Sequence, residues 1–258
     1  MKNSAREANS SSLFKDYFSP LASTYSRYRP NYPPELFEFV SSLVRTRELA
    51  WDCATGNGQA ALGLTTHFDK ILATDASELQ ILHAQPHSQI KYIVSSAEYS
   101  PFKTQSLDAI VSATAVHWFD FNKFYKEVRR VLKPNGILAV WCYGWIHVSK
   151  EIDAVIDFFK TSVVGPYWTP ERRYVDEEYK TIPFPFNEIP APSFRMERLW
   201  NLDETLGYLN TWSSSQLYKE NNGKEPTEKI RNKLQQTWGA AEEQRIITWP
   251  MFVRVGRV

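Results

Sequence analysis

Residues 51–61 read Trp51-Asp52-Cys53-Ala54-Thr55-Gly56-Asn57-Gly58-Gln59-Ala60-Ala61, and this stretch decides the fold. Its apolar start ends a predicted strand, and the segment after Gly58 opens a predicted helix. The glycines allow a tight turn and let the backbone approach a ligand closely. Asp75 ends the next predicted strand, 19 residues after Gly56 (75 − 56 = 19), where a carboxylate accepts hydrogen bonds from ribose hydroxyls. The pattern predicts a nucleoside-binding crevice.

The loop by itself also fits two other interpretations. The run from Gly56 to Ala61 satisfies the Gly-x-Gly-x-x-Ala form of the dinucleotide fingerprint. A glycine loop that binds no ligand is the simpler alternative, which the position of Asp75 disfavours. The choice between a nicotinamide dinucleotide and another nucleoside cofactor must therefore come from elsewhere in the chain.

Strand-like and helix-like segments alternate around this loop. Because such alternation buries both faces of a parallel sheet, it predicts a doubly wound α/β fold with right-handed crossovers. The predicted strands are 49–53, 71–74, 90–94, 107–112, 137–141 and 246–255. The predicted helices are 36–44, 58–68, 77–84, 122–132, 203–212 and 227–238. Six prolines between 165 and 192 predict an irregular insertion rather than sheet.

The composition excludes several classes of protein. Thirty basic and 29 acidic residues give a net charge of +1, without the basic excess expected of a nucleic-acid-binding protein. The only cysteines, Cys53 and Cys142, lie in apolar runs, so we expect no disulfide framework, no metal cluster and a cytoplasmic location. No run approaches the roughly 18 apolar residues of a membrane span. Residues 1–12 are polar and Ser/Asn-rich, which predicts a disordered tail without a signal peptide.

A specific series of motifs surrounds the loop. Tyr25-Ser26-Arg27-Tyr28-Arg29-Pro30-x-Tyr32-Pro33 precedes it, and it is followed by Ala97-Glu98-x-x-Pro101-Phe102, Val116-His117-Trp118-Phe119-Asp120 and Leu132-Lys133-Pro134-Asn135-Gly136. In this order the chain resembles the class I S-adenosylmethionine-dependent methyltransferases, and more narrowly the trans-aconitate methyltransferase-like branch. The resemblance is strong over residues 14–143 and weaker to the end. It implies a mostly parallel seven-stranded sheet with an antiparallel last strand, which 246–255 supplies.

The resemblance also implies a site for S-adenosylmethionine at the ends of the first four strands. Its residues are Asp52, Ala54, Thr55, Gly56 and Gly58 for the methionine end, Asp75 for the ribose, Ala76, Ser96, Ala97 and Glu98 around the adenine, and Ala113 facing both cofactor and substrate. Ala54 departs from the family, since glycine is usual there, and Ser96 stands where many relatives carry Asp. The alternative for Glu98 is to cap the following turn.

Residues 13–34 are too aromatic for a free tail, whereas Arg29-Pro30 and Pro33-Pro34 prevent a continuous helix. We expect a flap over the crevice that excludes water, with Tyr28 and Arg29 among the cofactor-binding residues. The planar Arg29 guanidinium would bind a carboxylate of the cofactor or of an acidic acceptor. The alternative is that Arg29 pairs with a surface acid and that the tyrosines are ordinary packing.

His117 is the candidate catalytic residue, beside Trp118, which is expected to form a wall of the site. A histidine pKa of about 6.5 suits a general base, which helps when the acceptor must lose a proton and is dispensable for a carboxylate. The alternative for His117 is a packed ring with one nitrogen satisfied. The other histidines show no metal-ligand spacing, so we expect no metal.

These interpretations combine into one domain over 13–258. It comprises the flap, a cofactor-binding core at 49–143, a substrate-side insertion at 144–222, and a C-terminal helix and strand at 223–258. The resemblance implies methyl transfer from S-adenosylmethionine to an oxygen, less readily a nitrogen, of a small organic acceptor such as a carboxylate. The alternatives are a nicotinamide-dependent oxidoreductase and a methyltransferase-fold binding protein without catalysis. The neutral charge disfavours a nucleic-acid partner, and we expect no membrane partner.

Overall fold

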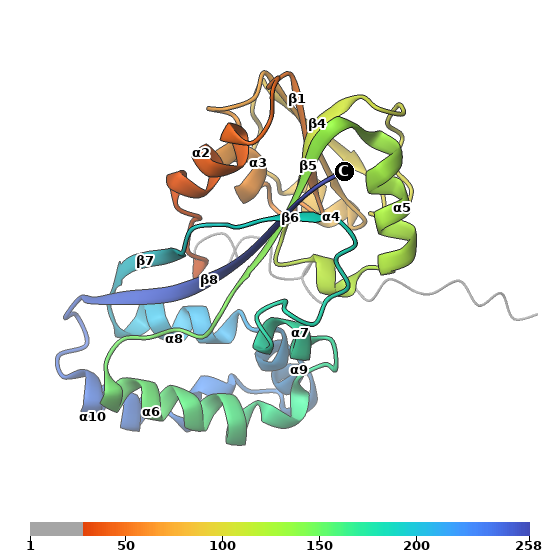
Figure 1. Cartoon of the computed structure of the whole chain (residues 1–258). Coiled ribbons are helices and arrows are strands. Elements are labelled where there is room, and N and C mark those ends of the chain that lie inside the picture. The colour runs from red at the N-terminus through yellow and green to blue at the C-terminus, as the bar shows by residue number, and fades with distance from the viewer. Residues whose placement is uncertain (1–27) are drawn as a thin grey trace, which may run out of the picture.

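The computed structural model describes residues 28–258, in which one mixed sheet carries strands from both halves of the chain (Figure 1). The first half supplies β1 (Leu49–Cys53), β2 (Lys70–Asp75), β3 (Ile90–Val94), β4 (Leu107–Ala113) and β5 (Leu132–Tyr143). The second half supplies β6 (Asn187–Ile189), β7 (Phe194–Trp200) and β8 (Arg245–Arg257). The order is β3-β2-β1-β4-β5-β8-β6, and β7 also pairs with β8.

The first five strands are parallel, and β8 is antiparallel to β5. From β1 the chain runs outward to β2 and β3, and then returns to β4 on the other side of β1. The order therefore reverses between β1 and β4, which is the place where ligands bind in doubly wound sheets. The predicted α/β fold with an antiparallel last strand is confirmed.

The segments β6 and β7 share one edge of β8. Ile189 pairs with Val255 and Phe194 pairs with Met251, so both segments run antiparallel to β8 along the same side. Pro190 and Pro192 lie between them, and proline has no N–H to donate to a strand ladder. The sheet is thus seven strands wide, as predicted, but β6 and β7 share the edge position beside β8. The expectation of no sheet between 165 and 192 is wrong for β6, because a three-residue strand lies within the proline-rich stretch.

Helices cover both faces of the sheet. The odd-numbered residues from Ile137 to Trp141 pack with α2 (Pro34–Ser42) and α3 (Gln59–Leu64). The even-numbered residues from Leu138 to Cys142 pack with α5 (Phe121–Val131) on the other side. Because successive side chains of a strand point to opposite faces, the apolar part of β5, residues 137–143, is buried on both. A short helix, α4 (Glu78–Leu82), follows β2.

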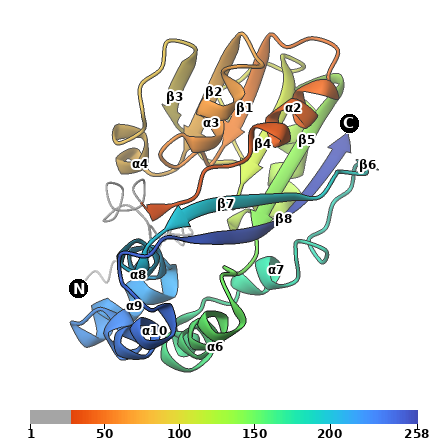
Figure 2. The ribbon, with the colours of Figure 1, turned by 90° about the vertical axis from the view of Figure 1, so that its left-hand side faces the viewer.

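The helices of the second half gather at one end of the sheet (Figures 1 and 2). They are α6 (Lys150–Phe158) with its π-helical continuation η3 (Phe159–Val163), η4 (Gly165–Tyr167), α7 (Arg172–Asp176), α8 (Leu202–Asn210), α9 (Ser213–Asn222), η5 (Pro226–Lys229) and α10 (Arg231–Trp238). The predicted helices 203–212 and 227–238 correspond to α8 and to η5 with α10. The sequence patterns did not predict α6, α7 and α9; in α9 only Leu217 and Tyr218 are not polar, so it lacks apolar periodicity.

Two predicted segments lie wholly or mostly outside the described residues: the tail, 1–12, and the flap, 13–34, of which only 28–34 are described. Between residues 28 and 258, every helix is too short or too polar to cross a membrane.

Candidate active site

The loop between β1 and α3 lies at the carboxyl end of β1, beside the point where the strand order reverses. Gly56 and Gly58 have φ values of 56° and 91°, in the left-handed region that glycine tolerates. Ala54 has a φ of 58°, so alanine adopts here the conformation of the usual glycine, at a cost of about 1 kcal/mol. The Thr55 N–H donates to the Thr74 carbonyl at 2.8 Å, which holds the loop against β2.

Asp52 is the last but one residue of β1, and its side chain is fully buried. Its Oδ2 accepts a hydrogen bond from the Thr55 hydroxyl, whereas its Oδ1 has no partner within residues 28–258. Burial raises the pKa of Asp52 to about 7, because the carboxylate loses its hydration. An ammonium group at Oδ1 would supply the missing partner, and S-adenosylmethionine carries one on its methionine end. Asp52 therefore fits the expected cofactor.

Asp75 joins the glycine loop to the turn after β2. One carboxylate oxygen accepts the Gly56 N–H and the other accepts the Ser77 N–H, each at 2.9 Å. Each oxygen has more than one lone pair, so the carboxylate can also accept hydrogen bonds from ribose hydroxyls. Asp75 thus has a structural role that the sequence analysis missed, beside the predicted role in ribose binding.

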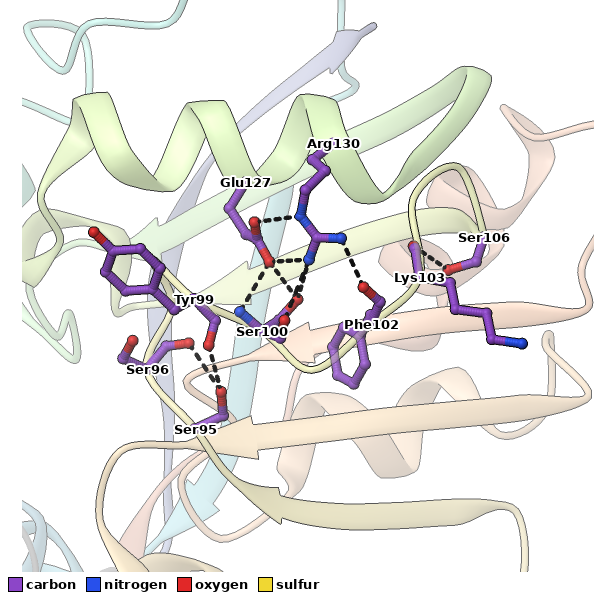
Figure 3. A network of polar contacts seen from close by, with 9 residues as sticks. All are labelled: Ser95, Ser96, Tyr99, Ser100, Phe102, Lys103, Ser106, Glu127 and Arg130. Carbon is purple, nitrogen blue, oxygen red and sulfur yellow. Dashed lines mark hydrogen bonds and ion pairs between the residues drawn. The ribbon is translucent and has the colours of Figure 1, made fainter.

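The segment after β3 is fastened to α5 (Figure 3). Both the N–H and the hydroxyl of Ser100 donate to Glu127, which is only 7% exposed. Glu127 forms an ion pair with Arg130, whose guanidinium also donates to the Phe102 carbonyl at 2.7 Å. Ser95 adds a hydrogen bond to the Tyr99 carbonyl. Residues 95–102 are therefore held in place at the edge expected for the adenine.

The predicted adenine-binding residues lie on two neighbouring turns. Ala76 is exposed after β2, while Ser96, Ala97 and Glu98 follow β3, with Ala97 buried. The Glu98 carboxylate accepts the Asp120 N–H at 3.1 Å, at the start of α5. This contact lies 22 residues along the chain and not in the turn after Glu98, so it is neither of the two predicted roles, and the contact of Glu98 with adenine stays a prediction.

A pocket opens at the carboxyl ends of β4 and β5, one strand away from the glycine loop. It is partly open to solvent, and the space within it amounts to about 660 Å³ when that open solvent is included. Its lining comprises Arg29, Thr114, His117, Trp118, Tyr143, Gly144, Trp145, Trp168, Thr169, Arg172, Val175, Tyr208, Trp212 and Ser213. Thr114, next to Ala113 at the end of β4, has a φ of 54°. Such strain is unusual for a β-branched residue and concentrates at functional sites.

His117 lies in the short helix η2 (Val116–Trp118) and is 7% exposed. Its Nδ1 lies 2.7 Å from the Tyr179 hydroxyl, and its ring lies 5.0 Å from the Trp118 ring. Burial, together with the smaller effect of the Arg172 cation, lowers the pKa of His117 to about 3. The ring is therefore neutral at physiological pH and far less basic than a histidine in water. The alternative of a packed ring with one nitrogen satisfied therefore holds for Nδ1. His117 nevertheless lines the pocket together with Trp118.

Tyr28 and Arg29 lie against α8 and the residues that follow it. Arg29 donates to the Tyr143 hydroxyl and to the Thr211 carbonyl, and its guanidinium carbon lies 5.5 Å from the Tyr208 ring centroid. A Cβ on Gly207 would come within 2.6 Å of the Tyr28 ring, so glycine at 207 permits this packing. Arg29 thus belongs to the lining of the pocket, and the predicted binding of cofactor by these two residues stays a prediction.

Three tryptophans and Arg172 complete the pocket, and the sequence analysis did not assign them a role. Trp145, Trp168 and Trp212 contact one another with ring centroids 5.2–5.7 Å apart. The Arg172 guanidinium carbon lies 4.0 Å from the Trp145 centroid and 4.9 Å from that of Trp168. Only the aromatic content of the insertion hinted at this cluster, because its members are far apart in sequence.

Known proteins resemble the chain over most of its length. Residues 51–140 match the model of a methyltransferase domain. A Dictyostelium discoideum protein described as a methyltransferase is 30% identical over 225 residues, which cover 86% of each chain. A solved structure from Anaeromyxobacter dehalogenans, described as a type II methyltransferase, is 39% identical with a TM-score of 0.83, covering 89% of this chain and 98% of the other.

Proposed function

This chain belongs to the class I S-adenosylmethionine-dependent methyltransferases, and we propose that it methylates an oxygen of a small organic acid. The observation that carries the proposal is the pocket beside the glycine loop. Within the described residues its lining contains two arginines, Arg29 and Arg172, and no carboxylate. S-adenosylmethionine, when bound, supplies a methyl group activated by a positively charged sulfur. A carboxylate acceptor has no proton to lose, so the weak basicity of His117 is no obstacle.

The cofactor would be held by the loop from Asp52 to Gly58 and by Asp75. The unpartnered Asp52 Oδ1 supports binding of the methionine ammonium. The Asp75 carboxylate, which the Gly56 and Ser77 N–H groups hold beside the loop, would accept hydrogen bonds from the ribose hydroxyls. The turns that contain Ala76 and Ser96 would then flank the adenine.

Arg172 is suited to bind the carboxylate of the acceptor. Its Nε pairs with Asp176 at 3.2 Å, and its two terminal nitrogens form no hydrogen bond with residues 28–258. A guanidinium offers a planar pair of donors that matches a carboxylate. The surrounding tryptophan rings favour an acceptor with an apolar or aromatic body.

Residues 144–222 supply most of the lining, which supports the proposal that this segment is the substrate side of one domain. The nicotinamide-dependent alternative is not retained, because a relative that covers 86% of the chain shows its family. The proposed cytoplasmic location rests on Cys53 and Cys142, which are both buried and unpaired.

The test is transfer of radiolabelled methyl groups from S-adenosylmethionine to a panel of aliphatic and aromatic carboxylic acids, each paired with its amide. We expect methyl esters from some of the acids and no product from the amides. Arg172→Met should raise the KM of the accepted acid about 10- to 100-fold, since a hydrogen bond to a charged group contributes roughly 1.5–3 kcal/mol. Arg231→Met, which removes an exposed ion pair with Asp203, is the matched control. Equal transfer to amides or amines, or an unchanged KM for Arg172→Met, would contradict the proposal.

A further inference from the structure

Within residues 28–258, Tyr179 is the only side-chain hydrogen-bond partner of His117, and it comes from a segment 62 residues further along the chain. It is completely buried, and its hydroxyl lies 2.7 Å from His117 Nδ1. Nε2, the other ring nitrogen, forms no hydrogen bond within residues 28–258, and His117 lines the substrate pocket. Tyr179 therefore occupies one side of the ring and leaves Nε2 for a bound acceptor.

The backbone that carries Tyr179 is strained and firmly held. Glu178 and Tyr179 have φ values of 60° and 61°, two successive left-handed residues without a glycine. Each such residue costs about 1–2 kcal/mol and persists only where the surroundings enforce it. Here the Tyr179 N–H donates to the Tyr174 carbonyl at 2.8 Å, and the Tyr179 carbonyl accepts from Arg254 of β8 at 3.0 Å. Arg254 also donates to Ile182 at 2.7 Å. The sheet thus fixes the turn that presents the Tyr179 hydroxyl.

The hydrogen-bond partners available to each group decide whether His117 Nδ1 or the Tyr179 hydroxyl is the donor. Within the described residues, Nδ1 is the only partner of the Tyr179 hydroxyl. If Nδ1 carried the proton and donated to the hydroxyl, the tyrosine O–H would itself have no acceptor. An unsatisfied buried donor costs roughly 1–3 kcal/mol, whereas a hydroxyl that donates to Nδ1 satisfies both groups. Tyr179 therefore donates, and the proton of the neutral imidazole resides on Nε2.

We infer that Tyr179 is a positioning residue that holds His117 as an Nε2–H donor toward the methyl acceptor, so that His117 orients the acceptor oxygen instead of removing a proton. The inference rests on the proposed function in one respect, because an acceptor that is already an anion needs no base. This role accounts for the burial of His117 against Tyr179, because the buried ring stays neutral. A neutral N–H donor beside the Arg172 cation favours binding of an oxygen anion. The low pKa of His117 agrees with this arrangement, since the ring stays neutral.

The test reads the tautomer directly, without turnover. His117 is the only buried histidine of the five in the chain, so its signals in long-range ¹H–¹⁵N NMR spectra of the histidine-labelled protein can be assigned by their loss in His117→Gln. We expect the proton on Nε2, unchanged between about pH 5.5 and 8. The charged or titratable groups that act on the pair are Arg172 on His117, and Cys142, Tyr32, Arg172 and Tyr125 on Tyr179.

Tyr179→Phe should shift the Nδ1 resonance, because that nitrogen loses its donor. Tyr125→Phe is the matched control: it removes another buried hydroxyl, which donates to the Pro183 carbonyl at 2.6 Å, and should leave Nδ1 unchanged. A wild-type proton on Nδ1, a protonation midpoint inside the pH range, or an unchanged Nδ1 resonance in folded Tyr179→Phe would each overturn the inference. If Tyr179→Phe does not fold, the wild-type tautomer alone decides. An Nε2–H tautomer combined with transfer to amides or amines would contradict only the proposed acceptor class.

Discussion

Burial shifts the pKa values of His117 and Asp52 in opposite directions, to about 3 and about 7. The cause is the same in both, because loss of water disfavours the charged form of either group. In the free protein His117 is therefore neutral at pH 7, and Asp52 is close to half ionised. The proposed roles follow from these states, because a neutral His117 can offer an N–H and an ionised Asp52 can accept a cation.

Substitution of His117 distinguishes a hydrogen-bond donor from a base. Glutamine retains an N–H near the position of Nε2, whereas alanine removes it. We expect His117→Ala to lower kcat/KM for the carboxylate found in the acid–amide panel about 10- to 100-fold, and His117→Gln to retain most of the activity. If His117 were the base, both variants would lose roughly 100-fold or more. Steady-state kinetics at pH 7 measure the difference, and His147→Gln, at an exposed site, is the control.

Asp52 should make binding of S-adenosylhomocysteine dependent on pH. The product has the same ammonium group as the cofactor, and that group binds the ionised carboxylate better than the protonated one. The free carboxyl has a pKa of about 7 and the bound one a lower pKa, so affinity falls as the pH drops below about 7. The limit is about tenfold per pH unit. Calorimetric titrations between pH 5.5 and 8 measure the profile, which should flatten in Asp52→Asn. An equal slope in both proteins would exclude Asp52 as the group responsible.

Among the elements, α5 holds the segment after β3 through a single ion pair. Glu127 is almost buried, and Arg130, whose side chain is 36% exposed, is the cation beside it. Together they hold the backbone of Ser100 and Phe102, and so the segment after β3 (Figure 3). A helix on one face of the sheet thereby sets the position of the loop in which we predict contacts with adenine.

Arg130→Gln should destabilise the protein, because it leaves the Glu127 carboxylate without its cation. Removing one partner of a fully buried pair costs about 3–5 kcal/mol, and partial exposure of Arg130 reduces the expected loss to about 2 kcal/mol. Urea unfolding measures this change, and hydrogen exchange should increase at residues 95–102. Lys126→Gln, at an exposed position of the same helix, should change the unfolding free energy by less than about 0.5 kcal/mol. A similar small change in Arg130→Gln would show that the pair carries little stability.

At the scale of the whole molecule, β8 joins the two halves of the chain. It pairs with β5 on one side and with β6 and β7 on the other. One apolar cluster continues from α2 and α3, across the sheet, to buried residues of α6, α8 and α10. The proposed substrate side is therefore packed on the same core as the glycine loop.

We expect the protein to unfold in one cooperative transition. Six of the nine tryptophans lie at or after position 145, so fluorescence reports mainly on the second half, whereas far-UV circular dichroism reports on all helices and strands. The two urea transitions should coincide, and S-adenosylhomocysteine should shift both by the same amount, since it binds the native state. A fluorescence transition at lower urea than that of the dichroism would show that the second half unfolds separately.

The sequence by itself determined the five parallel strands, the antiparallel last strand and the position of the glycine loop. Strands such as 90–94 and the spacing of Gly56 and Asp75 are local patterns, so they can be recognised without knowledge of distant contacts. Only the tertiary structure decided the pairing of His117 with Tyr179, the pocket formed by Arg172 and the tryptophans, and the edge shared by β6 and β7. The physical reason is that desolvation and hydrogen bonding depend on which distant residues surround a group. No spacing along the chain indicates that a histidine will be buried against a tyrosine 62 residues away, and that burial sets its protonation and its chemistry.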